Sequence, residues 1–224
     1  MSDLLFLIWI IGCGVGMVEV LKGVHSINLS EDGGLGLEAW ILNCPQGLIL
    51  VDTGMRESAF EKIKAELDSI GKSWGDIKKI LITHKHGDHV RNLAKAVELT
   101  GAEVLSHEYE APLIKESTGV EVKGLKHGEV LDYCGGVKVI HIPGHSEGNA
   151  SYYLPAVKAI IAGDTIFADD EGTMETPPER YCLDADQAAR EINRLLEYDF
   201  DAILLTHGKN TMKGAKDRVK ALCE

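Results

Sequence analysis

The chain has 224 residues, of which 45% are hydrophobic, and its formal net charge at pH 7 is −12. A single domain of this size buries roughly 70% of the surface that its unfolded chain exposes. Proteins that hold a nucleic-acid backbone need clustered Lys and Arg, so this acidic balance argues against nucleic acid as a partner. The sequence shows no interdomain linker rich in Pro, Ser or Gly, and it does not indicate an oligomeric state.

The five cysteines are odd in number, scattered and without a C-x-x-C pair; they are Cys13, Cys44, Cys134, Cys182 and Cys223. This pattern predicts neither a disulfide framework nor a thiolate zinc site. Reduced, isolated thiols are typical of a cytoplasmic protein, which is the location that we expect.

Residues 1–16 form an apolar N-terminal extension whose status the sequence leaves open. The apolar run at 4–18 is shorter than the ~20 residues that cross a bilayer, so no stable membrane span is expected. It also carries Asp3 where a secretory signal has positive charge. The alternatives are a signal peptide, a natural start at Met17, and an extra strand or helix of the fold; we favour the last two. Residues 17–224 are expected to form the domain.

Short strands alternate with helices along the first half of the chain, as in an α/β fold. Strands are predicted at 24–28, 38–43 and 48–51, followed by a helix at 58–70 with an apolar stripe of Phe60, Ile63, Leu67 and Ile70. A strand at 79–83, a helix at 91–99 that stops before Gly101, and a strand at 103–106 follow.

The second half repeats this alternation, with strands at 137–141, 151–154 and 158–162. Asp184 and Gln187 have the spacing of a capping box and predict the start of a helix that runs to Leu196. A strand at 202–206 and a helix at 213–222 end the chain.

Apolar strands run directly into a His or Asp at five places: LILVDTG, KILITHKHGDH, VKVIHIPGH, AIIAGDT and AILLTHG. In layered α/β proteins functional side chains gather in the loops beyond strand ends. These five strand ends are therefore expected to bring their polar side chains to one edge of the fold.

The densest of these segments places His84, His86, Asp88 and His89 within six positions. Random shuffling of this composition gives such a segment roughly once in a thousand sequences. Residues two apart in an extended turn share a face, so His84 and His86 suit one metal ion, while Asp88 and His89 suit a second. His145 would complete the first site and His207 the second, and Asp164 has two oxygens with which to bridge the ions.

The signature H-x-H-x-D-H, followed by Gly144-His145-Ser146, Gly163-Asp164 and Thr206-His207-Gly208, resembles the metallo-β-lactamase superfamily. The resemblance covers the chain from about Val24 and fills all seven ligand positions. It implies an αββα sandwich in which two mixed β-sheets lie between helix layers. It also implies that Asp52 orients a histidine that binds metal.

The resemblance and the ligand set together predict a dinuclear hydrolase. A metal-bound hydroxide would attack a carbonyl carbon, and Asp88 would help the leaving group to depart. Nitrogen and oxygen donors favour two Zn²⁺ per chain and leave Fe or Mn open. The alternative is a mononuclear iron persulfide dioxygenase of the same superfamily, which would use the positions matching His84, His145 and Asp164. A binding module that lacks activity is the third reading.

The expected substrates are small neutral or hydrophobic esters, thioesters or lactones, because the ligand segments have no basic cluster near them that could pair with an anion. Ile166 and Phe167, with the hairpin tip at 33–37, are expected to form an apolar rim. Gly208 directly after His207 departs from the Glu-Tyr pair of glyoxalase II-like enzymes, which speaks against glutathione thioesters. Phe167 stands where many lactonases of the superfamily have tyrosine.

Overall fold

The structure is a computed structural model that describes residues 18–31 and 36–224. The predicted N-terminal extension at 1–16 lies outside the described residues, as do Gly33, Gly34 and Leu35 of the hairpin tip. In the described part of the chain, no helix combines the length and the apolar character needed to cross a membrane.

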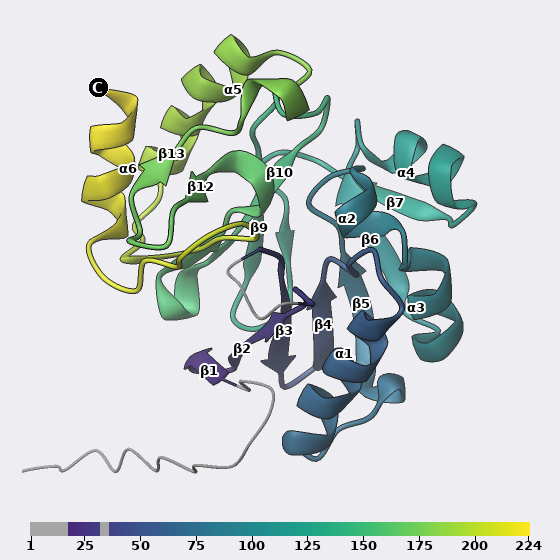
Figure 1. Ribbon diagram of the computed structural model, residues 1–224. Coiled ribbons are helices and arrows are strands. Elements are labelled where there is room, and N and C mark those ends of the chain that lie inside the picture. The colour runs from purple at the N-terminus through teal and green to yellow at the C-terminus, as the bar shows by residue number, and fades with distance from the viewer. Residues whose placement is uncertain (1–17, 32–35) are drawn as a thin grey trace, which may run out of the picture.

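Two mixed sheets stand face to face in the middle of the molecule, and helices cover both outer faces (Figure 1). Over the described residues the first sheet has the order β1-β2-β3-β4-β5-β6-β7 and the second the order β14-β11-β10-β9-β8. This is the αββα sandwich that the family resemblance predicts, and the expectation is confirmed.

The first sheet is antiparallel from β1 to β4 and parallel from β4 to β7. Its strands are β1 (Val18–Leu21), β2 (Val24–Asn28), β3 (Glu38–Cys44), β4 (Gly47–Val51), β5 (Ile77–Leu81), β6 (Glu103–His107) and β7 (Val122–Leu125). The helices over its outer face are α1 (Ser58–Ser69), α3 (Leu93–Thr100) and α4 (Ala111–Thr118). Ile63 and Leu67 of α1 are fully buried in this layer, with Phe60 and Ile70 packed at its border, so the predicted stripe is confirmed.

The second sheet is antiparallel except where β11 pairs with β14. Its strands are β8 (Val130–Leu131), β9 (Val137–His141), β10 (Ala150–Leu154), β11 (Ala159–Ile161) and β14 (Ala202–Leu204). Its outer face is covered by η5 (Ile192–Glu197) and α6 (Ala215–Cys223). The preceding α5 (Ala185–Glu191) packs against Gly144, while β12 (Phe167–Ala168) and β13 (Met174–Glu175) form a separate ribbon. The backbone amide of Gln187 donates to Asp184 Oδ1 at 2.8 Å, which confirms the predicted helix start. The second half of the predicted capping box is absent from the described contacts, since the Asp184 amide donates to the Gly144 carbonyl oxygen, and the helix continues beyond Glu191 as the 3₁₀ turn η5.

The apolar layer between the sheets includes Trp40 from β3 and Tyr152 from β10, both fully buried. Burying such aromatic side chains is a large favourable contribution to folding, because each removes 150–250 Å² from water, by the usual rough range. The Tyr152 hydroxyl donates to the Ile82 carbonyl oxygen at 2.7 Å, so the ring also ties the second sheet to the end of β5.

Several elements differ from the sequence prediction. The strand predicted at 79–83 runs from Ile77 to Leu81. Thr83 lies beyond it, where its amide and hydroxyl donate to Asp52 and its carbonyl oxygen accepts a hydrogen bond from Ala150 of the second sheet. A short α2 (Gly87–Val90) precedes α3, and α4, β1, β7 and β8 were not predicted. Asn92 separates α2 from α3, and its side-chain nitrogen donates to the carbonyl oxygens of Thr53 and Arg56.

Cys44 at the end of β3 and Cys134 after β8 form a disulfide across 90 residues of sequence. The prediction that the cysteines form no disulfide is therefore wrong for this pair. The two cysteines meet because the end of the first sheet lies against the β8–β9 turn of the second. Disulfides are rare where thiols are kept reduced, so the cysteine pattern no longer supports a cytoplasmic location, which stays a prediction.

Candidate metal centre

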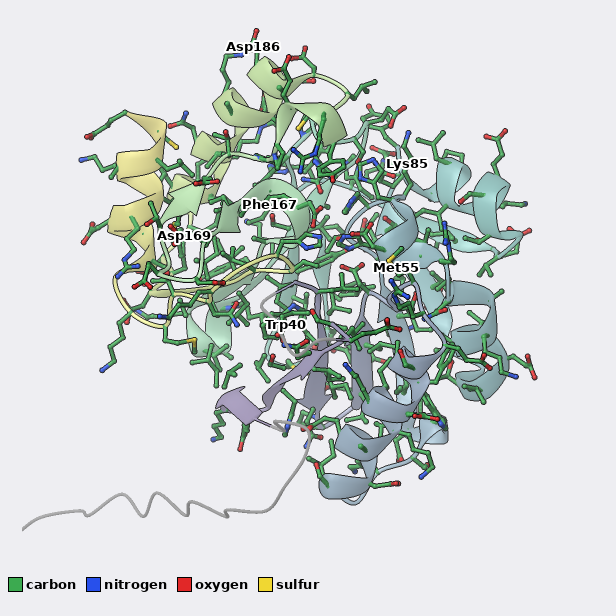
Figure 2. All side chains as sticks on the ribbon, viewed as in Figure 1. Trp40, Met55, Lys85, Phe167, Asp169 and Asp186 are labelled. Carbon is green, nitrogen blue, oxygen red and sulfur yellow. A yellow bond between two sulfur atoms is a disulfide. The ribbon has the colours of Figure 1, made fainter. Side chains whose placement is uncertain are left out.

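The predicted ligands leave five structural elements at one common edge of the two sheets. His84 and His86 follow β5, and Asp88 and His89 lie in α2. From the second sheet come His145 after β9, Asp164 in η3 (Gly163–Thr165) after β11, and His207 after β14. Figure 2 shows this edge between the labelled Lys85, Met55 and Phe167. The expectation that the strand ends bring these side chains together is confirmed.

The side chains form two groups, in each of which all ligand atoms lie within 4.8 Å of one another: His84, His86 and His145; and Asp88, His89, Asp164 and His207. In the first group, His84 Nε2 is 3.0 Å from His86 Nδ1 and 3.2 Å from His145 Nε2. In the second, Asp88 Oδ2 is 3.2 Å from His207 Nε2. Three ring nitrogens that converge this closely offer their lone pairs to one point in space.

Asp164 lies between the two groups and faces both. Its Oδ2 is 3.4 Å from His145 Nε2 and 3.8 Å from His84 Nε2. Its Oδ1 is 3.2 Å from His89 Nε2. Its Oδ2 also lies 3.5 Å from His207 Nε2 of the second group. The carboxylate thus faces histidines of both groups, as a bridging ligand requires.

Two buried atoms at the meeting point of the groups have no hydrogen-bond partner: His89 Nε2 and Asp164 Oδ1. They are close enough to interact but are not aligned for a hydrogen bond. Leaving a buried nitrogen and a carboxylate oxygen unsatisfied costs about 1–3 kcal/mol each. A cation between them would satisfy both, so the residues present fit a metal ion.

Burial and charge separate the two groups electrostatically. Burial holds the pKa of His84 well below its usual value and lowers the pKa of His145 to about 4, so both rings are neutral at neutral pH. Burial also opposes protonation of His207, but hydrogen bonds to Asp164 and Asp88 outweigh it and raise the pKa of His207 to about 10. The first group therefore has free lone pairs, while the second contains carboxylates that attract positive charge.

Asp52 holds His89 in a fixed orientation. His89 Nδ1 donates to Asp52 Oδ2 at 2.8 Å, which fixes the tautomer and turns Nε2 toward Asp164. Asp52 also accepts hydrogen bonds from the Thr83 amide and hydroxyl at 2.9 and 2.8 Å. Its φ is +60°, an uncommon conformation for a residue with a side chain. These contacts agree with the orienting role that the resemblance implies for Asp52, which stays a prediction.

Glu110, which sequence reasoning missed, joins the two loops that carry the first histidine group. Its carboxylate accepts hydrogen bonds from the Lys85 amide at 3.0 Å, the Gly148 amide at 2.8 Å and the Ser146 hydroxyl. The side chain is fully buried, and a Cβ at Gly148 would lie 2.6 Å from the Glu110 nitrogen. No motif marks this residue, because its partners are 25 to 38 residues away in sequence.

The remaining described histidines lie outside the two groups. His25 is buried and pairs with Glu66 at 2.7 Å. The rings of His107 and His141 stack with centroids 3.9 Å apart.

His207 Nδ1 donates to the Gly36 carbonyl oxygen, so the loop after β14 contacts the predicted hairpin tip.

A cavity of about 610 Å³ opens beside the two groups. His86, Asp88, Asp164 and His207 contribute to its wall, and the other lining residues are Met55, Gly87, Arg91, Phe167, Arg180 and Tyr181. Phe167 belongs to the apolar rim as predicted, and its ring stacks on His207 with centroids 5.0 Å apart.

Two expectations about this rim are wrong. Ile166 is fully buried in the layer behind the second sheet, because strand alternation turns it away from the cavity. The cavity also has basic residues, Arg91 and Arg180, which removes the reason given for neutral substrates. Arg91 follows directly after Asp88-His89-Val90, one helical turn beyond Gly87. This spacing could have indicated from the sequence that a basic side chain lies close to the ligands.

The chain is similar in sequence to curated hydrolases. A relative in Rhizobium meliloti, a hydroxyacylglutathione hydrolase, is 36% identical over 116 residues, which are 49% of this chain and 44% of that protein. The chain thus matches less than half the length of this relative. A probable metallo-hydrolase of Bacillus subtilis, YflN, is 23% identical over 93% of this chain and 92% of its own length.

Among solved structures, a metallo-β-lactamase family protein of Thermus thermophilus superposes with a TM-score of 0.74 at 21% identity, covering 91% of this chain and 79% of that chain. A subclass B3 metallo-β-lactamase of Bradyrhizobium japonicum gives a TM-score of 0.68 at 23% identity, covering 85% and 77%. At these identities the likeness concerns the fold alone. The family model described as the metallo-beta-lactamase superfamily matches residues 39–207, and the chain therefore belongs to that superfamily.

Proposed function

We propose that the chain is a dinuclear metal-dependent hydrolase of small carboxylic esters, thioesters or lactones. One ion would be held by His84, His86 and His145, and the other by Asp88, His89 and His207. Asp164 would bridge them. The observation that carries this proposal is the position of Asp164, whose carboxylate faces histidines of both ligand groups and lies next to an unsatisfied ring nitrogen.

The donor set supports zinc, since imidazole nitrogens and carboxylate oxygens suit that ion, although the same donors suit Fe or Mn. When bound, the ions would supply a nucleophile and a Lewis acid, because coordination lowers the pKa of water from ~15.7 to about 7 and polarises a carbonyl oxygen.

The chain's own residues orient and protect this chemistry. Asp52 fixes the His89 ring, and the Gly36 carbonyl oxygen fixes His207. Asp88 is the acidic ligand that also lines the cavity, and hydrogen bonding to His207 helps to lower its pKa against the opposing effect of burial. We propose that its carboxylate assists proton transfer to the departing alcohol or thiol while water adds to the acyl carbon.

Relatives named hydroxyacylglutathione hydrolase and metallo-hydrolase support a hydrolytic reaction. The second ligand group supports two ions over the single iron of the alternative dioxygenase, since Asp88, His89 and His207 would then have no ion to hold. A binding module without metal is disfavoured by the two unsatisfied buried atoms.

Metal content and substrate range test the proposal together. Elemental analysis of the purified protein should show about two zinc-type ions per chain. The kcat/KM should be measured for a p-nitrophenyl ester, an acyl thioester, a lactone, a chromogenic cephalosporin and bis-p-nitrophenyl phosphate, with oxygen uptake on a persulfide recorded alongside. Hydrolysis of one of the first three should dominate.

The opposite outcome is also well defined. If elemental analysis shows one tightly bound iron per chain and the protein consumes oxygen with a persulfide, the hydrolase proposal is wrong and the dioxygenase takes its place. Preference for the cephalosporin or the phosphodiester would overturn the substrate class.

A further inference from the structure

The cavity beside the ligand groups contains two arginines that the proposed chemistry does not use, Arg91 and Arg180. They come from separate elements: Arg91 closes α2, and Arg180 lies in η4 (Glu179–Tyr181). Both side chains are exposed at the cavity. Two positive charges at one cavity of a chain with net charge −12 call for a physical explanation.

The Arg91 guanidinium lies directly against the backbone that separates two ligands. A Cβ built on Gly87, between His86 and Asp88, would be 3.5 Å from an Arg91 terminal nitrogen and 3.8 Å from its Nε. The Arg91 amide donates to the Gly87 carbonyl oxygen at 3.0 Å, which anchors the residue to the same turn. Arg91 is therefore held within reach of a substrate bound at the ligand groups.

The segment of Arg180 is tied to the opposite ligand loop. The amides of Leu183 and Asp184 donate to the carbonyl oxygens of His145 and Gly144 at 3.2 and 2.8 Å. The Arg180 guanidinium carbon lies 4.6 Å from the centre of the Tyr181 ring. Stacking on an aromatic face restricts the guanidinium and leaves its N–H edge free to bind a ligand.

Within the described part of the chain, neither guanidinium forms an ion pair or a side-chain hydrogen bond. Arg56 and Arg194, by contrast, do have such partners: Arg56 pairs with Glu31 at 3.1 Å and Arg194 pairs with Glu191. Asp88 and Asp164 lie in the same cavity wall, but both belong to the proposed metal site. The two guanidinium groups are thus available to an anion from solution.

We propose that this cavity binds the carboxylate of an anionic acyl substrate, with Arg91 and Arg180 holding a carboxylate that is separate from the bond to be cleaved. The inference rests on the proposed hydrolase and narrows its substrates to carboxylated esters or thioesters. Guanidinium and carboxylate match in a planar, two-point hydrogen-bond geometry that selects this group. A cavity of about 610 Å³ suits a small molecule.

Matched pairs of thioesters test the proposal. The first pair is the glutaryl and pentanoyl thioesters of N-acetylcysteamine, which differ by a carboxylate in the acyl chain. The second is the acetyl thioesters of 3-mercaptopropionate and of its methyl ester, which differ in the leaving group. The ratio of kcat/KM for the anionic and neutral members should favour the anion about tenfold or more in at least one pair, as one charge-assisted contact allows.

Arg91→Gln and Arg180→Gln should each reduce that ratio about tenfold. Arg190→Gln is the matched control, because it changes the net charge by the same amount as the other two substitutions. Arg190 in α5 is exposed and is not among the residues that line the cavity. Equal ratios for wild type and variants, or the same loss in Arg190→Gln, would overturn the proposal.

Binding without turnover separates this inference from the proposed reaction. Calorimetry on the zinc-loaded protein would compare N-butyl glutaramate with N-butyl pentanamide, which are stable amide counterparts of the first pair. Preferred binding of the glutaramate that depends on Arg91 and Arg180, without hydrolysis of any thioester, would keep the anion site and reject the hydrolase. Hydrolysis of the thioesters with equal kcat/KM for the anionic and neutral members would keep the hydrolase and reject the anion site.

Discussion

Replacing Glu110 by alanine should destabilise the chain by about 2–4 kcal/mol and weaken metal binding by the first histidine group. The substitution leaves the buried amide of Gly148 and the part-buried amide of Lys85 without acceptors, at up to about 1–3 kcal/mol each. Burial raises the pKa of Glu110, so removing a buried carboxylate returns part of this cost. The expected loss therefore lies below the full sum for two orphaned amides.

Glu110→Gln should cost about half as much, since an amide keeps one acceptor oxygen but turns an N–H group toward the other amide. Urea unfolding of the metal-free protein measures the stability change, and competition with a chelator measures zinc affinity. Glu108→Ala is the control, because Glu108 is exposed and lies two residues earlier. If Glu110→Ala unfolds at the same urea midpoint and binds zinc as Glu108→Ala does, Glu110 does not hold the two loops.

Three further outcomes are expected. Asp164→Ala should lose at least one ion per chain and most turnover, because both proposed sites share that carboxylate; unchanged elemental content would remove Asp164 from the site. Burial lowers the pKa of His107 to about 4, so the unfolded chain takes up a proton near pH 6.5 while the folded chain does not. Stability should therefore fall between about pH 6.5 and 4 by up to about 3 kcal/mol, and His107→Asn should flatten that slope in urea titrations at several pH values. A slope unchanged in the variant would contradict this account. Reduction of the Cys44–Cys134 disulfide should lower the unfolding free energy by about 2–4 kcal/mol, and thiol titration in denaturant should show two fewer thiols before reduction than after it.

The two groups of candidate metal ligands were predictable from the sequence, because their residues follow directly after apolar strands. An apolar strand followed by His or Asp is visible locally, and the layered fold brings such ends to one edge without further information. Asp52 followed from the family resemblance, and its contacts with His89 and Thr83 agree with it.

Residues whose roles depend on distant partners were not predictable. Glu110 lies at the start of α4, where no sequence motif marks it. Its role is visible only in the folded chain, in which the amides of Lys85 and Gly148 donate to its carboxylate. Arg180 gains its position from hydrogen bonds to the His145 loop. The disulfide needs Cys44 and Cys134 to be neighbours in space, and spacing along the chain carries no such information.

The ligand edge is also the seam between two half-molecules. Backbone hydrogen bonds cross this seam from Glu38 to Thr206 at 2.9 Å and from Ala150 to Thr83 at 3.0 Å. The proposed first ion would draw its ligands from both halves, with His84 and His86 on one side and His145 on the other, and the second ion would do the same. Bound metal would then act as a further cross-link between the sheets, beside the shared apolar layer and the Cys44–Cys134 disulfide. Removing it should lower the free energy of local opening at the ligand edge and speed amide exchange there in both sheets.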